Sequence, residues 1–452
     1  MAPAAVANSP VFSFGFEPSP SLGAKLQPLK PKQSPSLSSS PRFVVDNLAE
    51  LLHQRQAKTE LHTRVAVIGC GFVGEHLVET FGEHYPVIGF DISESRCALL
   101  RQSFADKGMD KIITTSDERM LAKADAYLIS VPTLLKSDNT IDTSYIESAL
   151  VTVSKYAKPG NVIVMESSVG VGMTRQLLAP LRAQGVFCGM SPERVDPGRT
   201  FPAVKDIPKV ISGLDVESLE KIKTLYGAAF KQLVPVSCPE AAEMTKLFEN
   251  CYRMINIAFV NEIADACVMK NIDPLEVVRA ASSKPFGFQP FMPGLGVGGH
   301  CIPINPYYLF ASYNNDPSVL PLLRQASSTM WARPATLAKE LVSEMAQHMS
   351  PAKLRVLVVG AAFKPGESVI SCSPTVLFMK ALQELGVGKV EWIDPFVSQE
   401  QVPEVAKFGD ENWDARMIDE EFDVVCVGMR QKGLDFGVLD QCVQSRVAYY
   451  CA

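Results

Sequence analysis

Short runs of apolar, often β-branched residues alternate with helix-like segments in the first half of the chain. The runs occupy residues 64–69, 86–91, 126–132, 161–167 and 186–193. Continuous apolar runs are typical of strands that are buried on both faces, and their alternation with helices indicates βαβ units. The pattern therefore predicts an α/β fold that starts with a parallel sheet covered on both sides.

The periodicity changes after Pro239. Residues 240–271 follow a helical repeat with apolar side chains on more than one side. A helix of this length often connects domains or forms a subunit interface. We therefore expect a helical middle domain. A second series of apolar runs, which predicts a second α/β domain, occupies 353–363, 389–396, 422–429 and 446–451.

The N-terminal segment has a different composition. Residues 1–42 are dominated by Pro, Ser and Ala, and such a segment buries too little apolar surface to offset its ordering entropy. It lacks the apolar core of a secretion signal, and its prolines interrupt the helix of a mitochondrial presequence. An amphipathic stretch at 43–55 predicts a flank that docks on the first domain. The expected divisions are 1–60 for the disordered tail and flank, 61–235, 236–345 and 346–452.

The amino-acid composition narrows the classes of protein to which the chain could belong. The chain is 47% hydrophobic and 20% charged with a formal net charge of −6, which gives no reason to expect nucleic acid or an anionic membrane as partner. No apolar run is long enough to span a bilayer. The 11 cysteines are scattered without a Cys-x-x-Cys pair, and the 6 histidines are scattered too. We therefore expect neither a disulfide framework nor a metal site, and a reducing cytoplasm as location.

A dinucleotide fingerprint follows the first strand. Gly69, Gly71 and Gly74 form a Gly-x-Gly-x-x-Gly turn that includes Phe72 and Val73 and opens a helix. The first glycine permits the tight turn, the second admits a pyrophosphate, and the third allows close packing of helix and strand. The pattern predicts NAD binding by the first domain.

An acidic residue stands where the ribose would be bound. Asp91 ends the second apolar run, about twenty residues after the glycines. A carboxylate there accepts hydrogen bonds from the ribose hydroxyls and repels a 2′-phosphate, which favours NAD over NADP. The second α/β unit has only Gly360 at the equivalent turn, so we expect it to bind a different nucleotide.

Several residues are candidates for chemistry. Cys301 follows a glycine-rich run, Lys246 and Asn250 share one face of the long helix, and Glu166 follows an apolar run. Each has a structural explanation: a loop cysteine, a solvated helix face, and a helix N-terminal carboxylate. Taken together, a thiolate, an oxyanion-stabilising ammonium and amide, and a water-activating carboxylate fit oxidation of an alcohol to an acid through a thioester.

These residues lie within a series of stretches that resembles the UDP-glucose/GDP-mannose dehydrogenase family, and especially its UDP-N-acetylhexosamine (UDP-N-acetylglucosamine) 6-dehydrogenase branch. The resemblance implies a Rossmann NAD-binding domain, a central long-helix domain, a C-terminal Rossmann-like UDP-binding domain, a UDP-sugar substrate, and a homodimer or higher oligomer built on the long helix. The matching stretches are VAVIGCGFVG, SVPT, ESS, SPERVDPG, AAEMTKLFENCYRMINIAFVNEI, KPFGFQPFMPG, GVGGHCIPINPYYL and GAAFKP.

The resemblance also implies roles for single residues. Cys301 would be the nucleophile, Lys246 and Asn250 would stabilise oxyanions, and Glu166 would serve water or proton transfer. Thr133 would lie beside the nicotinamide. The residues implied for substrate binding are Glu193, Arg194, Arg253, Gly298 and Gly299, with Asn256 and His300 as further candidates.

Three positions depart from the family pattern. Asn305 replaces an aspartate four residues after the nucleophile, and an amide cannot accept a proton there. Ser371 replaces an arginine that contacts substrate, and residues 166–172 read ESSVGVG instead of an ESTTYPG-like loop. Each loss of a charged partner can cost on the order of a hundredfold in binding or rate.

The leading hypothesis is NAD-dependent, four-electron oxidation of C6 of a UDP-N-acetylhexosamine or UDP-hexose to the uronic acid. One alternative is a catalytically degenerate NAD- and nucleotide-binding protein, to which Asn305 and Ser371 point. The other is a two-electron dehydrogenase of related architecture, which needs no nucleophilic cysteine.

Overall fold

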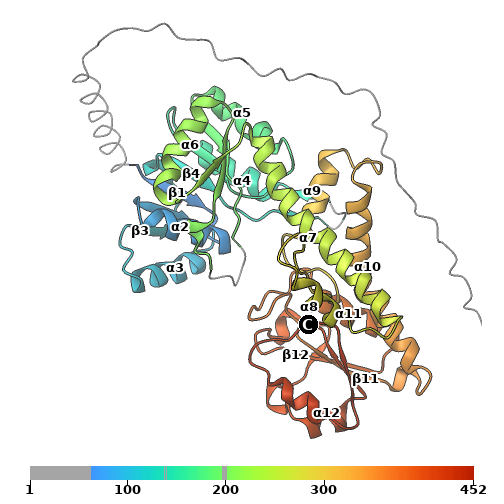
Figure 1. The fold of residues 1–452 in the computed structure, drawn as a ribbon. Helices are drawn as coiled ribbons and strands as arrows, with labels where there is room; N and C mark the ends of the chain where they lie inside the picture. Colours follow the sequence, from blue (N-terminus) through green and yellow to red (C-terminus); the bar gives the residue numbers. More distant parts are fainter. Residues whose placement is uncertain (1–62, 137, 139, 196–200, 452) are drawn as a thin grey trace, which may run out of the picture. The chain divides into compact units, whose positions relative to one another are not determined.

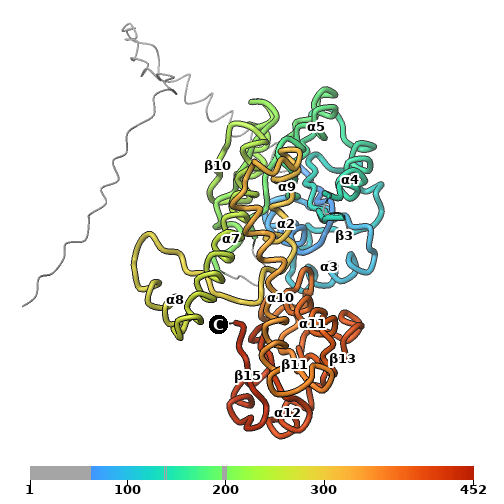
Figure 2. Tube along the Cα trace, turned by 90° about the vertical axis from the view of Figure 1, so that its right-hand side faces the viewer, coloured from blue at the N-terminus to red at the C-terminus, as the bar shows by residue number. Residues whose placement is uncertain are grey.

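A computed structural model of the chain describes residues 63–136, 138, 140–195 and 201–451 (Figures 1 and 2). These residues belong to a different unit of the chain from Met1–Gln56. The expected tail, 1–60, and flank, 43–55, lie outside the described residues.

The first α/β unit contains an eight-stranded sheet with the order β10-β9-β8-β7-β4-β1-β2-β3. All four residues of β1, β2, β4 and β7 are buried, as expected for strands covered on both faces. The strands are β1 Val65–Ile68, β2 Val87–Phe90, β3 Ile112–Thr115, β4 Ala126–Ile129, β7 Val162–Met165, β8 Phe187–Met190, β9 Lys209–Gly213 and β10 Leu233–Pro235.

One pairing in this sheet differs from the predicted parallel arrangement. Strand β8 pairs with β9 in an antiparallel direction, whereas the other neighbours are parallel. A parallel crossover usually carries a helix, and the described part of the β8–β9 connection contains only the 3₁₀ helix Val204–Asp206. The return direction places the start of β9 beside the end of β8.

Helices cover both faces of this sheet. Apolar residues of α4 and α5 pack on one face, and those of α2, α3 and α6 pack on the other. A small antiparallel hairpin, β5 Leu134–Leu135 and β6 Ile141–Asp142, follows β4. The helices are α2 Phe72–Gly82, α3 Glu94–Asp106, α4 Ser144–Ser154, α5 Met173–Ala183 and α6 Val216–Ala229.

The central part is helical, as predicted. The long helix α7, Pro239–Val268, lies within the predicted range except for its first residue, and proline at its start costs no hydrogen bond. Figures 1 and 2 show α10, Pro321–Met345, beside α7, against which it packs. The sequence pattern did not predict α10. The shorter helices are α8 Pro274–Ser282 and α9 Asn305–Ser312.

The second α/β unit has a five-stranded parallel sheet with the order β13-β12-β11-β14-β15. Its strands are β11 Arg355–Val359, β12 Lys389–Ile393, β13 Ala406–Lys407, β14 Val424–Val427 and β15 Arg446–Tyr449, and its helices are α11 Pro374–Glu384 and α12 Ala415–Glu421. Helix α10 packs against α11, which joins this unit to the helical part. Among the described residues, no helix is both long and apolar enough to cross a bilayer.

Candidate active site

The turn between β1 and α2 has the geometry of a pyrophosphate cradle. Gly69 has a φ of +87°, and a Cβ on Gly74 would come within 1.9 Å of the Gly69 carbonyl oxygen, so both positions require glycine. A Cβ on Gly71 would meet no atom within 4 Å, which leaves room for a ligand. The other two predicted cofactor residues, Phe72 and Val73, open α2, whose N-terminus favours an anion.

Asp91 is held beside this turn. Its two carboxylate oxygens accept hydrogen bonds from the backbone N–H groups of Cys70 and Ser93, at 2.8 and 2.9 Å, and each oxygen keeps a lone pair for a ribose hydroxyl. Arg96 is nearby, but its guanidinium is paired with Glu75 at 2.6 Å. Because this cation is neutralised, the turn offers no free charge to a 2′-phosphate, which agrees with the predicted preference for NAD.

The equivalent turn of the second α/β unit is closed. Gly360 has a φ of +87°, yet the acid beside it, Asp394, is fully buried. One oxygen of Asp394 accepts hydrogen bonds from Ala361 N, Ala362 N and the Gln431 side chain. Because Asp394 is fully buried, its oxygens are not accessible to a ribose, and this turn differs in that respect from the Asp91 turn.

Cys301 lies in the turn that leads into α9, with its side chain exposed. Its carbonyl oxygen accepts a hydrogen bond of 2.9 Å from Asn305 N. The Asn305 side chain is buried, and its amide oxygen accepts a short hydrogen bond from the Asn250 side chain on α7. The structure therefore brings these three predicted residues together. Desolvation lowers the pKa of the neighbouring His300, which favours a neutral ring.

Lys246 lies one turn before Asn250 on α7 and is half-buried. Its ammonium makes no hydrogen bond or ion pair with any described residue. After Lys209 and the backbone of Arg194, its charge contributes to the lowered pKa of Glu193. A half-buried ammonium without a partner is available to an anion.

Glu166 and Glu193 belong to one buried cluster. The ammonium of Lys209 donates to Glu166 Oε2 at 2.7 Å and to Glu193 Oε2 at 2.8 Å, and the hydroxyl of Tyr226 donates to Glu166 Oε1. Burial raises the pKa of Glu166 to about 7. Lys209 and Tyr226 are not among the site residues predicted from the sequence.

The remaining polar residues predicted for substrate binding have distinct surroundings. The guanidinium of Arg194 is paired with Glu249 on α7 at 2.6 Å and donates to the Pro208 carbonyl oxygen. Arg253 is exposed, and Asn256 is half-buried. Their contacts with substrate stay predictions.

Gly298 and Gly299 pack against the second α/β unit. A Cβ on either glycine would come within 3 Å of the Phe363 side chain, and Gly299 N donates to the Ser371 carbonyl oxygen at 2.8 Å. Glycine is therefore required for packing at these positions, apart from any contact with a sugar. Ser371, which replaces the family's arginine, lies directly on this glycine run.

The ESSVGVG loop after Glu166 is fixed by the helical part. Glu243 of α7 is buried and accepts hydrogen bonds from Gly172 N and Thr174 N, at 2.6 and 2.7 Å, where α5 begins. Val171 N donates to Ser312 Oγ of α9 at 3.0 Å. This departure from the family pattern thus connects the first sheet to the helix that follows Cys301.

Tyr308 is a further residue that the sequence analysis missed. Its side chain is fully buried on α9, and its hydroxyl has no hydrogen bond of standard geometry in the described part of the chain. Burial raises the pKa of Tyr308 to about 12; the Thr133 side chain opposes this shift and Cys301 adds to it. Tyr308 therefore lies near both Thr133 and Cys301, and it connects the predicted nicotinamide contact to the predicted nucleophile.

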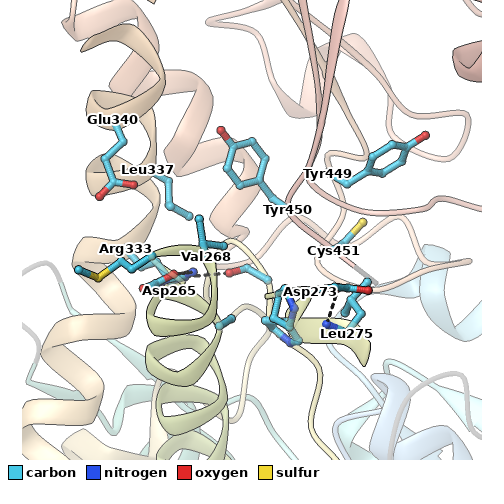
Figure 3. A pocket seen from close by; sticks show the side chains of 15 residues that line it. Asp265, Val268, Asp273, Leu275, Arg333, Leu337, Glu340, Tyr449, Tyr450 and Cys451 are labelled. Atoms are coloured by element: carbon cyan, nitrogen blue, oxygen red, sulfur yellow. Dashed lines mark hydrogen bonds and ion pairs between the residues drawn. The ribbon is translucent and has the colours of Figure 1, made fainter. Parts of the chain in front are cut away.

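A cavity of about 660 Å³ lies between α7, α8, α10 and the end of β15. Figure 3 shows Tyr449, Tyr450 and Cys451 on one side of it and Arg333 with Asp265 on the other. Arg333 donates to both carboxylate oxygens of Asp265 and to the carbonyl oxygen of Gly294. Gly294 begins the run that leads to Cys301.

Comparison of the sequence with known families gives two matches. Residues 63–230 match the NAD binding domain of the UDP-glucose/GDP-mannose dehydrogenase family, and residues 240–329 match the central domain of the same family.

Individual relatives agree with this result. The chain is 31% identical to the UDP-N-acetyl-D-glucosamine 6-dehydrogenase of Pseudomonas aeruginosa, over 75% of this chain and 84% of the relative. It is 29% identical to the UDP-N-acetyl-D-mannosamine dehydrogenase of Methanococcus maripaludis, over 75% of this chain and 81% of the relative. The solved structure of a UDP-D-ManNAc dehydrogenase from Pyrococcus horikoshii superposes with a TM-score of 0.73 at 25% identity, over 86% of this chain and 99% of that one.

The predicted fold class, family and cofactor are thereby confirmed. The chain belongs to the UDP-glucose/GDP-mannose dehydrogenase family and is an NAD-dependent oxidoreductase.

Proposed function

We propose that this protein oxidises the C6 hydroxymethyl group of a UDP-N-acetylhexosamine to a carboxylate, through a covalent intermediate on Cys301. The observation that carries the proposal is an exposed thiol at the start of α9, tied through Asn305 to Asn250 on α7. The names of the relatives support the class of sugar, because they include dehydrogenases of UDP-N-acetylglucosamine and UDP-N-acetylmannosamine.

The β1–α2 turn fits the cofactor. Gly71 leaves open space for a pyrophosphate, the N-terminus of α2 favours its charge, and Asp91 keeps acceptors for the ribose. When bound there, NAD supplies the hydride acceptor, and two equivalents are needed for a four-electron oxidation.

Cys301 retains the substrate between the two oxidations. Its thiolate adds to the C6 aldehyde and forms a thiohemiacetal, which is oxidised to a thioester by loss of a hydride and a proton. Water then attacks the thioester, the C–S bond breaks, and the acid and the free thiol are released. Two NAD and one water are consumed for each sugar.

Lys246 and Asn250 supply donors for the oxyanions. Asn250 uses one side-chain N–H for the bond to Asn305, so its second N–H remains as a donor. The ammonium of Lys246, which pairs with no described residue, adds a positive charge on the same face of α7. Such donors stabilise negative charge that develops during addition and hydrolysis.

We propose that Glu166 accepts and donates the protons that the reaction exchanges. Its raised pKa, about 7, suits a group that exchanges protons near neutral pH. Both of its oxygens are bonded inside the protein, so a proton reaches it through its partners or through water. Asn305 cannot perform this step because an amide does not accept a proton at neutral pH.

We place the uridine half of the substrate in the cavity of Figure 3. Its volume, about 660 Å³, lies in the range of small-molecule sites. It adjoins the carboxyl end of β15, and ligands of parallel α/β sheets bind beyond that end of the strands. Tyr449 and Tyr450 line this cavity, and aromatic side chains can contact a base. The run from Gly294 to Cys301 then leads along the backbone toward the thiol.

A homodimer is the proposed assembly. Large apolar side chains are exposed along α7. An exposed apolar surface of this kind marks an association site. The residues are Phe248, Tyr252, Phe259, Ile263 and Val268. We further propose a cytoplasmic location, because all eleven cysteines are free thiols in the structure.

A panel of UDP-sugars tests the proposal. Wild-type protein, Cys301→Ser and Cys251→Ser are incubated with NAD and each sugar, and NADH is followed by absorbance. The proposal expects NADH with a UDP-N-acetylhexosamine, loss of uronic acid formation in Cys301→Ser, and normal activity in Cys251→Ser, whose thiol is buried. Full activity of Cys301→Ser would instead indicate a two-electron dehydrogenase.

A further inference from the structure

A buried group of charges lies where β7 and β8 end and β9 begins. Lys209, the first residue of β9, bridges Glu166 and Glu193 with distances of 2.7 and 2.8 Å. The side chains of Lys209 and Glu166 are 2% and 0% exposed. The antiparallel return of β9 brings the lysine to this position, whereas the two acids come from the carboxyl ends of neighbouring strands.

Aromatic residues enclose the group. Tyr226 of α6 donates to the Glu166 oxygen that Lys209 does not bind, and Phe230 lies under the Lys209 ammonium at 5.4 Å from the ring centre. Tyr226 also packs on Phe81 of α2. The group is therefore excluded from solvent by the helices that cover this face of the sheet.

The two acids have different environments. Burial opposes ionisation of Glu193, but the charge and hydrogen bond of Lys209, followed by the backbone N–H of Arg194, lower its pKa. Val195 N also donates to this carboxylate. Among the described residues, no backbone N–H donates to the Glu166 carboxylate, and burial raises its pKa. Two buried carboxylates and one ammonium carry one excess negative charge, so Glu166 is the acid of the group that takes up a proton near neutral pH.

We propose that Lys209 and Tyr226 are positioning residues of the active site, which bind Glu166 and Glu193 into one unit and control the ionisation of Glu166. The proposal rests on the proposed function, in which Glu166 exchanges protons and Glu193 belongs to the substrate turn. Other polar groups facing the unit are Ser191, which interacts with the Tyr226 hydroxyl, and Lys246 of α7, which faces Glu193.

The unit also fixes the substrate turn. Glu193 N donates to the Glu166 carbonyl oxygen, and Lys209 contacts the carbonyl oxygen of Pro192 in addition to the two acids. Backbone and side chain of the turn at 191–194 are thus both attached to the end of β7. Loss of the Lys209 ammonium would leave two carboxylates of like charge in the same buried space without a neutralising cation.

The test is the pH dependence of kcat/KM for Tyr226→Phe. The tyrosine hydrogen bond stabilises ionised Glu166, so its removal raises the pKa of Glu166 and moves the acid limb of the profile upward, by about one pH unit. At the pH of the wild-type midpoint, activity falls about fivefold and recovers at higher pH. The matched control is Tyr127→Phe, which removes an equally buried hydroxyl that donates only to backbone carbonyls.

A uniform loss of activity at every pH in Tyr226→Phe, or the same profile in both variants, would overturn the proposal. Lys209→Met is expected to abolish turnover, and Lys209→Arg to restore part of it because the charge is kept. If Lys209→Met does not fold, the pH profiles of kcat/KM of Lys209→Arg and wild type are compared instead. A displaced positive charge alters the midpoint of the acid limb of that profile.

A measurement independent of turnover separates this proposal from the proposed function. The infrared carbonyl band of a protonated carboxylic acid is titrated in wild type, Tyr226→Phe and Glu166→Gln. The proposal expects a band with a midpoint near neutral pH that is absent from Glu166→Gln and shifted upward in Tyr226→Phe. An unshifted midpoint would overturn the control of ionisation, even in a protein that oxidises no sugar.

Discussion

The side-chain amide of Asn250 donates a hydrogen bond to the side-chain oxygen of Asn305, and both residues are buried. The backbone N–H of Asn305 in turn holds the carbonyl oxygen of Cys301. A neutral amide thus occupies the position beside the thiol for which the family resemblance implies an acid. This pair sets the orientation of the thiol turn without supplying a base.

We predict that Asn305→Asp increases kcat by about tenfold, because a carboxylate accepts the same bond from Asn250 and also accepts a proton. Burial of the new charge lowers the free energy of unfolding by about 1–2 kcal/mol. Steady-state kinetics and urea denaturation measure the two effects. Asn305→Ala is the control, and a loss of activity in Asn305→Asp as large as in the control would show that the amide itself is required.

Lys246→Met should reduce kcat by about a hundredfold, because it removes a cation that is free to stabilise an oxyanion. The melting temperature should hardly change, since the ammonium makes no ion pair with any described residue. Lys270→Met, at the exposed end of the same helical region, is the matched control. Equal kinetics for the two variants would remove Lys246 from the active site.

Cofactor choice should depend on Asp91 and on the Arg96–Glu75 pair. Asp91→Ala combined with Glu75→Ala removes the ribose acceptor and frees the guanidinium, which is now paired at 2.6 Å. The double variant should bind NAD at least tenfold more weakly and NADP more tightly than wild type. Titration of both cofactors by fluorescence measures this. An unchanged NAD affinity would mean that neither acid contacts the ribose.

Tyr308→Phe should stabilise the ligand-free protein by roughly 1 kcal/mol, because it deletes a buried hydroxyl that makes no hydrogen bond of standard geometry with any described residue. Denaturant unfolding measures the change, with Tyr127→Phe as a variant that loses a bonded hydroxyl. If Tyr308→Phe is destabilised like Tyr127→Phe, the hydroxyl has a partner in solution, for which Thr133 is the nearest candidate.

The pH dependence of the free energy of unfolding should reveal the ionisation of Glu166. Its pKa is about 7 in the folded protein and lies near 4.3 in an unfolded chain. The folded state therefore binds the proton more tightly, and this group removes stability as pH rises from about 4 to 7. The free energy of unfolding of Glu166→Gln minus that of wild type should therefore increase by on the order of 2 kcal/mol between pH 5 and pH 8. A constant difference between the two proteins would show that the carboxyl group is not perturbed.

The elements with strong local signals could be predicted from the sequence. The Gly69–Gly74 turn and Asp91 could be predicted because binding of the phosphates and the ribose dictates the spacing between them. Helix α7 could be predicted from its uninterrupted helical repeat of apolar residues. Helix α10 was missed because Pro334 lies inside it, and proline usually ends a helix. The antiparallel β9 was missed because its direction depends on a connection without an α-helix.

Residues of the site that depend on tertiary contacts could not be predicted. A lysine at the start of a strand, such as Lys209, ordinarily points to solvent. Its burial results from two carboxylates that lie 43 and 16 residues away along the chain. Tyr308 resembles an ordinary core aromatic, and only the fold places its hydroxyl near Thr133 and Cys301.

The most direct test of the central claim is the amount of NADH formed for each UDP-sugar consumed. The reaction is run to completion with limiting UDP-N-acetylhexosamine and excess NAD, and sugar and uronic acid are quantified by chromatography. A covalent intermediate on Cys301 that is oxidised twice predicts two NADH and one uronic acid per sugar. One NADH per sugar, with free aldehyde in solution, would contradict it.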